Sequence, residues 1–343
     1  MAAKLSWGIL ATGHIAGVFA RGIAASQSGQ LVAVASRDQA TADRFARELG
    51  VPRAHGSYAA LLADRAVQAV YIATTHPQHA EWTIRAVEAG KHVLCEKPLT
   101  VDHASAVRVA GAARARGVLL MEAFMYRCHP QTARIVELVG GGAIGRVGLV
   151  QATFGFQRAF EADARLWNKA LGGGSILDVG GYPVSLARLI AGAADGRPFA
   201  DPMSVTGAGL LHPKTGVDVY AAATLKFANG IVAQVACGIG LEQDNSARIY
   251  GNEGWLHVPV PWAPCRDGGT ATMVLHRRGA AEPQEIRINA PPLFALEADT
   301  FAAALAAGQL EVPQMTLADT LGNMAALDRW RAAVGIAYPH EGA

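Results

Sequence analysis

The sequence predicts a two-domain α/β protein, in which a doubly wound parallel sheet precedes an α+β domain with a large, open, mostly antiparallel sheet. Three observations predict this. The chain has 343 residues, which is too long for one ordinary core. Short apolar runs alternate with helical patterns over the first part of the chain. Strand-like runs separated by turn residues then follow one another. We therefore expect one domain over residues 1–124 and a second over residues 125–343.

The first domain is expected to contain five strands joined by four crossover helices. Apolar residues repeat along one face of each helical pattern, and Gly50, Gly90 and Gly117 stand where three of the helices should end. The predicted strands are Lys4–Leu10, Leu31–Ala35, Gln68–Ala73, Lys91–Cys95 and Val118–Met121. The predicted helices are Ile15–Ser26, Thr41–Leu49, Gln78–Ala89 and Asp102–Arg116.

The second domain is expected to pair a strand meander with a few helices. Helices are predicted at Pro130–Val139, Val179–Ala191 and Leu317–Ala333. The predicted strands are Gly148–Phe156, Ser204–Leu211, Val217–Phe227, Ile231–Ile239, Ala247–Tyr250, Trp255–Val258 and Ala271–His276, with a typical hairpin turn at Asn229-Gly230. We expect helices to pack on one face of such a sheet, which leaves the other face to be covered. We expect a second subunit on the other face, which predicts a homodimer or a dimer of dimers.

Composition excludes several classes of partner. Hydrophobic residues make up 51% of the chain and charged residues 17%, which is typical of a folded protein. The 30 basic and 28 acidic residues form no basic run, so no nucleic-acid partner is expected. No apolar stretch reaches the roughly 18 residues of a membrane span, and no signal peptide is evident, so we expect a cytoplasmic protein. The cysteines, Cys95, Cys128, Cys237 and Cys265, are isolated, which predicts neither a metal site nor disulfides.

The first strand runs into a turn that is typical of dinucleotide-binding Rossmann domains. Such turns read G-x-G-x-x-G or G-x-G-x-x-A, and the middle glycine lets the backbone approach the pyrophosphate at the helix N-terminus. Here the turn reads A-T-G-H-I-A, with Gly13 in the middle position and Ala11 in the first. The alternative is an ordinary strand-to-helix turn. Because the A-T-G-H-I-A segment directly follows the first strand, we favour cofactor binding. The candidate residues are Ala11, Thr12, Gly13, His14 and Ile15.

The ends of the next strands supply further cofactor candidates. Ser36 and Arg37 end the second strand, where they could bind a 2′-phosphate, and this favours NADP. Asp38 follows one residue later, and a small shift of the turn would make it the ribose carboxylate of an NAD enzyme. The third strand leads into a loop expected over the cofactor, and the fourth ends in C-E-K-P-L. These segments provide Thr74, His76, His79, Glu96 and Lys97.

Three motifs together resemble the Gfo/Idh/MocA family of NAD(P)-dependent oxidoreductases. They are the dinucleotide turn, E-K-P at Glu96–Pro98 and G-G-G-S-I-L-D-V-G-G-Y-P at Gly172–Pro183. The segment M-E-A-F-M-Y-R-C-H-P-Q, residues 121–131, is similar to the branch of dimeric dihydrodiol dehydrogenases, NADP-dependent xylose dehydrogenases and anhydrofructose reductases. The resemblance implies that nicotinamide binds between the domains, that the second sheet forms a subunit interface and that the peptide bond before Pro98 is cis. It maps the catalytic site onto Lys97, Asp178 and Tyr182.

These three residues suggest how a proton is moved while a hydride is transferred. A tyrosine with a pKa of about 10 is a poor base at neutral pH, and a nearby ammonium would lower that pKa. Lys97 is therefore expected to tune Tyr182 as the acid/base and to hydrogen-bond the reacting oxygen, while Asp178 orients the substrate or Lys97. Asp178 and Tyr182 are four residues apart, so both are expected to lie on one face at the start of a helix. The alternatives are a surface lysine, a helix-capping Asp178 and a core tyrosine.

Phe124, Arg127, Arg165 and Trp167 are candidates for the substrate pocket, because they flank the motifs above. Core packing or a structural ion pair is the alternative for each. The expected substrate is a sugar, polyol or cyclic trans-diol. Two other functions stay open. One is a sugar–sugar oxidoreductase with tightly bound NADP, and the other is a non-catalytic regulator that senses NADP or a sugar.

Overall fold

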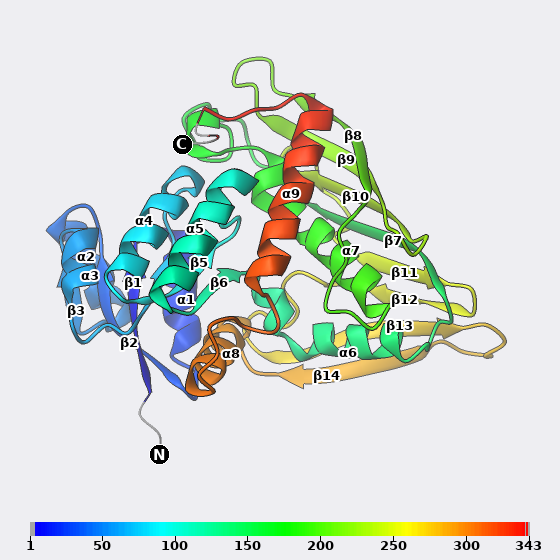
Figure 1. Cartoon of the computed structure of the whole chain (residues 1–343), viewed down its shortest axis with the longest axis horizontal. Coiled ribbons are helices and arrows are strands. Elements are labelled where there is room, and N and C mark those ends of the chain that lie inside the picture. The colour runs from blue at the N-terminus through cyan, green and yellow to red at the C-terminus, as the bar shows by residue number, and fades with distance from the viewer. Residues whose placement is uncertain (1–3, 340, 342–343) are drawn as a thin grey trace.

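The computed structural model describes residues 4–339 and 341 and confirms the predicted fold class. Its first half is a parallel sheet in the order β3-β2-β1-β4-β5-β6. The strands are β1 (Leu5–Leu10), β2 (Gly29–Ala35), β3 (Arg53–His55), β4 (Ala69–Ile72), β5 (His92–Glu96) and β6 (Leu120–Ala123). The helices between them are α1 (His14–Ile23), α2 (Gln39–Leu49), α3 (Tyr58–Ala63), α4 (His76–Glu88) and α5 (His103–Arg116) (Figure 1).

The first sheet has one strand more than the five predicted. β3 is only three residues long and pairs with β2 at the edge of the sheet. All three of its residues, Arg53, Ala54 and His55, are half-buried, so it carries no apolar run and no alternation that a sequence pattern could reveal. The helix α3 that follows was also missed, although Ser57 caps it by accepting a hydrogen bond from the amide of Ala60 at 3.2 Å.

Local signals explain where the longer helices begin and end. Asp38 caps α2 by accepting a hydrogen bond from the Thr41 amide at 2.8 Å, and Asp102 caps α5 through the Ser105 amide at 2.7 Å. Gly50 and Gly117 end these helices with φ of 67° and 62°, a conformation that favours glycine. Because α2 follows β2 and α5 follows β5, both helices start at the carboxyl edge of the parallel sheet, where the candidate site residues lie.

The second half is an eight-stranded sheet in the order β14-β13-β12-β11-β7-β10-β9-β8. Only β7 and β10 pair in parallel. The strands are β7 (Val147–Gly155), β8 (Ser204–Leu211), β9 (Asp218–Lys226), β10 (Val232–Gly238), β11 (Ala247–Gly251), β12 (Gly254–Val258), β13 (Gly269–Arg277) and β14 (Gln284–Ala290). The helices α6 (Pro130–Gly140), α7 (Gly181–Ala193) and α9 (Leu317–Val334) lie on one side of it (Figure 1). β14, an edge strand with no buried residue, was not predicted.

Helix α8 (Leu293–Ala306) was not predicted either, and it packs against the first half of the chain (Figure 1). Phe301 lies 5.0 Å from Trp7 between ring centroids, and Asp299 accepts hydrogen bonds from the hydroxyls of Ser26 and Ser28. A Cβ on Gly22 of α1 would come within 2.5 Å of the Phe294 Cβ, so α8 needs glycine there. Residues far beyond 124 thus complete the core around α1.

Two absences hold for residues 4–339 and 341. No helix in that part of the chain is long and apolar enough to cross a membrane. The same residues contain no cluster of three or more histidine, cysteine, aspartate or glutamate side chains that could hold a metal ion.

Candidate functional site

A cavity of about 1000 Å³ opens at the carboxyl ends of the parallel strands and extends to the second half of the chain. It lies beside β1 and β4, where the strand order reverses and doubly wound sheets bind their ligands. Every cofactor candidate lines it: Ala11, Thr12, Gly13, His14, Ile15, Ser36, Arg37, Thr74, His76, His79, Glu96 and Lys97. From the second half come Met125, Arg165, Ala170, Leu171, Asp178 and Tyr182.

The turn after β1 fits the pyrophosphate of a dinucleotide. Among the described residues, no side chain caps the N-terminus of α1, so its first amides face the cavity without a side-chain partner. A Cβ on Gly13 would meet nothing within 4 Å, which shows that the space beside this residue is open. Open backbone amides at a helix N-terminus are a ready-made site for an anion.

Ala11 has a φ of 91°, which explains why glycine is typical at this position. Its amide donates to the carbonyl oxygen of Ala35 at 3.1 Å, and this bond holds the turn against β2. A left-handed conformation costs a residue with a Cβ roughly 1–2 kcal/mol. The cavity therefore begins with a strained residue.

Replacing Ala11 with Gly is expected to raise the free energy of unfolding by about 1 kcal/mol, because glycine adopts positive φ without the clash of a Cβ. Chemical denaturation of the two proteins without cofactor measures the difference. Ala59→Gly in α3, where the backbone is helical, is the matched control and should lower stability by about 1 kcal/mol. A loss of stability in both variants would contradict the assignment of strain to Ala11.

The residues after β2 have different surroundings: Ser36 and Arg37 have side chains available to a ligand, whereas the carboxylate of Asp38 caps α2. Ser36 and the exposed Arg37 both line the cavity. Asp38 lines it as well, but its carboxylate serves as the α2 cap, and the hydrogen bonds from Thr41 lower its pKa. Tyr58 of α3, which sequence reasoning missed, also borders this end of the cavity. Its ring packs edge-on against Trp82 at 4.9 Å.

Lys97 lines the cavity close to Asp178 and Tyr182. Its Nζ donates to the backbone oxygen of Asp178 at 2.7 Å and lies 3.9 Å from the Asp178 Oδ1. The same atom is 5.3 Å from the centroid of the Tyr182 ring. The side chain is only 16% exposed, so Lys97 is not a surface lysine. The Lys97–Pro98 peptide bond is cis, as the resemblance implied, and the carbonyl oxygen of Pro98 lies 2.8 Å from the Nδ1 of His79.

Asp178 is a buried carboxylate held by two cations. Arg165 donates to its Oδ1 at 2.8 Å. Burial alone would raise the pKa of Asp178, but the charges of Arg165 and Lys97 outweigh it and lower the pKa to about 2. Asp178 lies within a π-helical turn, Ile176–Gly180, that precedes α7. It is therefore not the helix cap considered above, since Gly180 occupies the N-cap position of α7.

His76 connects the two halves of the site. Its Nδ1 donates to the carbonyl oxygen of Gly172 at 2.9 Å, and its Nε2 faces Nη1 of Arg165 at 3.4 Å. Burial, with the charge of Arg165, lowers the pKa of His76 well below its usual value, so the ring is neutral. Gly172 has a φ of 69°, and a Cβ there would lie 2.8 Å from the Cβ of His76. The start of the G-G-G motif is thus pressed against α4.

Tyr182 is enclosed by aromatic rings. The centroids of Phe124, Phe154, Tyr126 and Trp262 lie 5.0, 5.1, 5.9 and 5.9 Å from its own. Its hydroxyl donates to the Sδ of Met125 at 3.4 Å. Met125, Phe154 and Trp262 were not predicted. Phe154 and Trp262 lie far from the motifs in sequence, and Met125 is an apolar residue that looks like any core residue.

The expected pKa of Tyr182 needs correction. Burial, with the charges of Glu96 and Glu297, raises the pKa of Tyr182 well above its usual value. The Lys97 ammonium lies over the ring face and is bonded to Asp178, so it does not offset burial. Tyr182 is therefore a neutral phenol in this state, which is the form that donates a proton.

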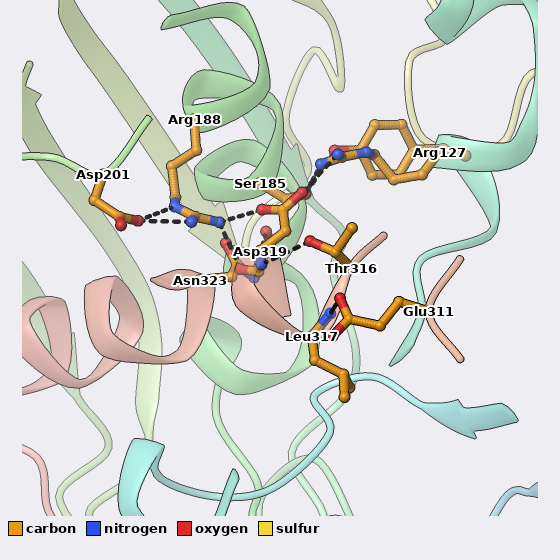
Figure 2. A network of polar contacts seen from close by, with 11 residues as sticks. Arg127, Ser185, Arg188, Asp201, Glu311, Thr316, Leu317, Asp319 and Asn323 are labelled. Atoms are coloured by element: carbon orange, nitrogen blue, oxygen red, sulfur yellow. Dashed lines mark hydrogen bonds and ion pairs between the residues drawn. The ribbon is translucent and has the colours of Figure 1, made fainter. Parts of the chain in front are cut away.

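Of the four substrate candidates, only Arg165 lines the cavity. Phe124 packs against Tyr182, and Trp167 is 4% exposed beside Val217 and Ile239. Arg127 points away from the cavity, into a buried polar network with Ser185 and Asp319 (Figure 2). The reason is the 3₁₀ turn η1 (Met125–Cys128) after β6, which directs Tyr126 and Arg127 into the core.

Comparison with known proteins agrees with these motifs and this fold. The family model described as "Oxidoreductase family, NAD-binding Rossmann fold" matches residues 5–124, and the "GFO/IDH/MocA C-terminal domain" matches residues 132–257. The chain belongs to the Gfo/Idh/MocA family. It is therefore an NAD(P)-dependent oxidoreductase, as the motifs implied.

Relatives within the Gfo/Idh/MocA family match two thirds of the chain or more. Trans-1,2-dihydrobenzene-1,2-diol dehydrogenase of Mus musculus is 33% identical over 98% of this chain and 99% of its own. D-xylose 1-dehydrogenase (NADP(+)) 2 of Haloferax volcanii is 40% identical over 67% of this chain and 68% of its own. The structure of KijD10, a 3-ketoreductase from Actinomadura kijaniata in complex with NADP and TDP-benzene, is 30% identical, with a TM-score of 0.86 over 96% of this chain and 98% of its own.

Proposed function

We propose that this protein is an NADP-dependent dehydrogenase or reductase that acts on a CH–OH group of a sugar, polyol or cyclic trans-diol. One observation carries the proposal: Lys97, Asp178 and Tyr182 line the same cavity as the open N-terminus of α1. The names of two relatives, a dihydrobenzene-diol dehydrogenase and a D-xylose dehydrogenase, and that of the 3-ketoreductase KijD10 support this substrate class.

NADP is favoured over NAD by the charges after β2. Ser36 and Arg37 line the cavity and can bind a 2′-phosphate. Asp38 follows, but its carboxylate accepts a hydrogen bond from Thr41. The backbone at Ala11–Gly13 would hold the pyrophosphate, and Glu96 and Lys97 would border the nicotinamide. When bound, NADP or NADPH supplies the hydride acceptor or donor.

The protein's own residues then manage the proton and the charge on the reacting oxygen. In reduction, the neutral Tyr182 phenol donates its proton to the carbonyl oxygen. The Lys97 ammonium has three N–H donors, of which one binds the Asp178 backbone, so others can bind the same oxygen. Asp178 lies between the charges of Lys97 and Arg165 and holds both side chains in place. In oxidation, the deprotonated oxygen of Tyr182 would accept the proton of the substrate hydroxyl and become a phenol again.

The test is the absorbance of reduced nicotinamide with NADP and NAD separately, against aldoses, inositols and cyclic trans-diols. Turnover with NADP and one of these classes supports the proposal. A sugar–sugar oxidoreductase is the second candidate, because the structure of aldose–aldose oxidoreductase from Caulobacter crescentus is 25% identical, with a TM-score of 0.85. It would purify with nicotinamide already bound and show little exchange. Tight NADP binding without any turnover would instead indicate a regulator.

We also propose that the protein forms a dimer, or a dimer of dimers, through the second sheet. Figure 1 shows α6, α7 and α9 on one side of that sheet. The opposite face has an open hollow of about 670 Å³, lined mostly by small or uncharged side chains such as Ala208, Ala222 and Gln234. An open sheet face with few charged side chains is suited to pairing with a second copy of the same chain.

Ala222→Arg is expected to halve the mass in solution, from dimer to monomer or from tetramer to dimer, because the exposed Ala222 lies on that open face and would bring a charge into the interface. Sedimentation velocity at micromolar concentration measures the mass. Ala60→Arg, at an exposed position of α3, adds the same charge elsewhere and should leave the mass unchanged. A monomeric wild-type protein, or an unaltered mass in Ala222→Arg, would contradict the proposal.

A further inference from the structure

We infer that the segment Met125–Arg127 positions Tyr182 by fixing the start of helix α7. Only the expected effect on turnover rests on the proposed function, in which Tyr182 is the acid/base. Three consecutive residues contact Tyr182 or its helix. The Met125 Sδ accepts the Tyr182 hydroxyl at 3.4 Å, and the Tyr126 hydroxyl and the Arg127 Nη1 both donate to the Ser185 Oγ, at 2.8 and 3.0 Å.

Ser185 is the point at which this segment holds the helix. It lies three residues after Tyr182 on α7, so the two side chains lie on neighbouring turns of one helix face. Ser185 is fully buried, and its single hydroxyl accepts from two donors of η1. A rotation of α7 about its axis would break both bonds and move the Tyr182 hydroxyl at the same time.

A buried ionic network anchors Arg127 (Figure 2). Its Nη2 lies 2.6 Å from the Asp319 Oδ2, while the Nη1 of Arg188 on α7 lies 2.5 Å from the Oδ1 of the same carboxylate. Arg188 also pairs with Asp201 at 2.6 Å. The side chains of Arg127, Arg188 and Asp319 are 4%, 0% and 2% exposed. Breaking one such pair leaves a buried charge without its partner, so the network resists any displacement of η1, α7 or α9 against one another.

Tyr126 and Arg127 act through Tyr182, because neither of them lines the cavity. Of the three residues in the segment, only Met125 lines the cavity, whereas Tyr126 and Arg127 are 1% and 6% exposed. The thioether of Met125 is a weak acceptor, so it holds the Tyr182 hydroxyl in place and still releases it to a substrate oxygen. Proton transfer needs its partners within hydrogen-bond reach, so a small displacement of Tyr182 costs turnover. Tyr126, Arg127 and Ser185 are therefore positioning residues.

Ser185→Ala and Tyr126→Phe test this inference, since each removes one hydroxyl and keeps the buried charges paired. The position of Tyr182 is followed directly by NMR of protein labelled with ¹³C at the tyrosine ζ carbon. The chain has only seven tyrosines, and Tyr182→Phe identifies the resonance. We expect the Tyr182 resonance to move in both variants, kcat to fall about threefold to thirtyfold and the KM for substrate to stay within twofold. Ser26→Ala, which removes a buried hydroxyl beside Asp299, is the matched control and should change neither.

The outcomes separate this inference from the proposed function. If Ser185→Ala lowers kcat in the wild type but not in Tyr182→Phe, the segment acts through Tyr182. If the resonance moves while kcat stays unchanged, the positioning is supported and the acid/base role of Tyr182 is lost. An unmoved Tyr182 resonance in both variants would overturn the inference, whatever Tyr182→Phe does to turnover. An equal fall of kcat in both backgrounds would overturn it as well.

Discussion

Replacing Tyr182 with Phe is expected to lower kcat by about 10³-fold while NADP still binds. The variant keeps the aromatic ring and its contacts with Phe124 and Phe154 but removes the hydroxyl. General acid–base catalysis contributes roughly 10²–10⁴-fold, and that contribution should be lost. Steady-state kinetics with the substrate found in the panel give kcat, and quenching of tryptophan fluorescence on titration with NADP gives cofactor affinity.

Tyr250→Phe on β11 is the matched control, because it removes a tyrosine hydroxyl away from the cavity. Its kcat should match the wild type. A Tyr182→Phe enzyme with normal turnover would show that the proton travels by another route, and Tyr182 would then be only a core aromatic residue.

Lys97→Met belongs to the same prediction. It tests the hydrogen bond from Lys97 to the reacting oxygen separately from proton transfer by Tyr182. Methionine has a similar length, so the loss is chiefly that of the ammonium and of its bond to the Asp178 backbone. We expect kcat to fall by about 10²–10³-fold, since hydrogen bonding to a developing oxyanion contributes on this scale. Lys226→Met on β9, at an exposed position, is the control. Equal rates in Lys97→Met and wild type would exclude Lys97 from the reaction.

The cofactor end of the site could be predicted because strand ends converge. In a doubly wound sheet the residues after parallel strands meet at one edge, so Gly13, Arg37, His76 and Lys97 could be grouped from strand order alone. The same argument failed where direction mattered. Arg127 follows β6 closely, but the 3₁₀ turn directs its side chain toward Asp319. Asp319 is far from Arg127 in the sequence, and the sequence does not reveal that the two are in contact.

The electrostatic state of Tyr182 was predicted with the wrong sign for a related reason. The motifs correctly placed Lys97 beside Tyr182, at 5.3 Å from its ring. They did not reveal that Asp178 would engage the ammonium, nor that the buried Glu297 of the unpredicted helix α8 would add a carboxyl group to the surroundings of the ring. A pKa depends on every group that packs around the titrating atom, and most of those groups come from distant segments.

Replacing Arg37 with Ala is expected to raise the KM for NADP by about 10–100-fold and to leave the KM for NAD within threefold. A hydrogen bond to a charged group contributes roughly 1.5–3 kcal/mol, and only NADP carries the 2′-phosphate that Arg37 would bind. The two KM values come from the same assay with each nucleotide. Arg47→Ala, at an exposed position of helix α2, which follows the Arg37 turn, removes an equal charge outside the cavity and is the control.

Ionic strength and a second variant test further whether the charge of Arg37 decides the choice between NADP and NAD. The preference of the wild type for NADP should weaken as ionic strength rises, because Arg37 is exposed and its interaction with the phosphate is screened. Ser36→Asp would place a carboxylate at the end of β2 and should turn the preference toward NAD by repelling the phosphate and binding the ribose. Equal changes for both nucleotides in Arg37→Ala would mean that Arg37 supports the fold of the β2–α2 turn rather than the choice of cofactor. Asp38, which caps α2, would then be the residue that meets the ribose.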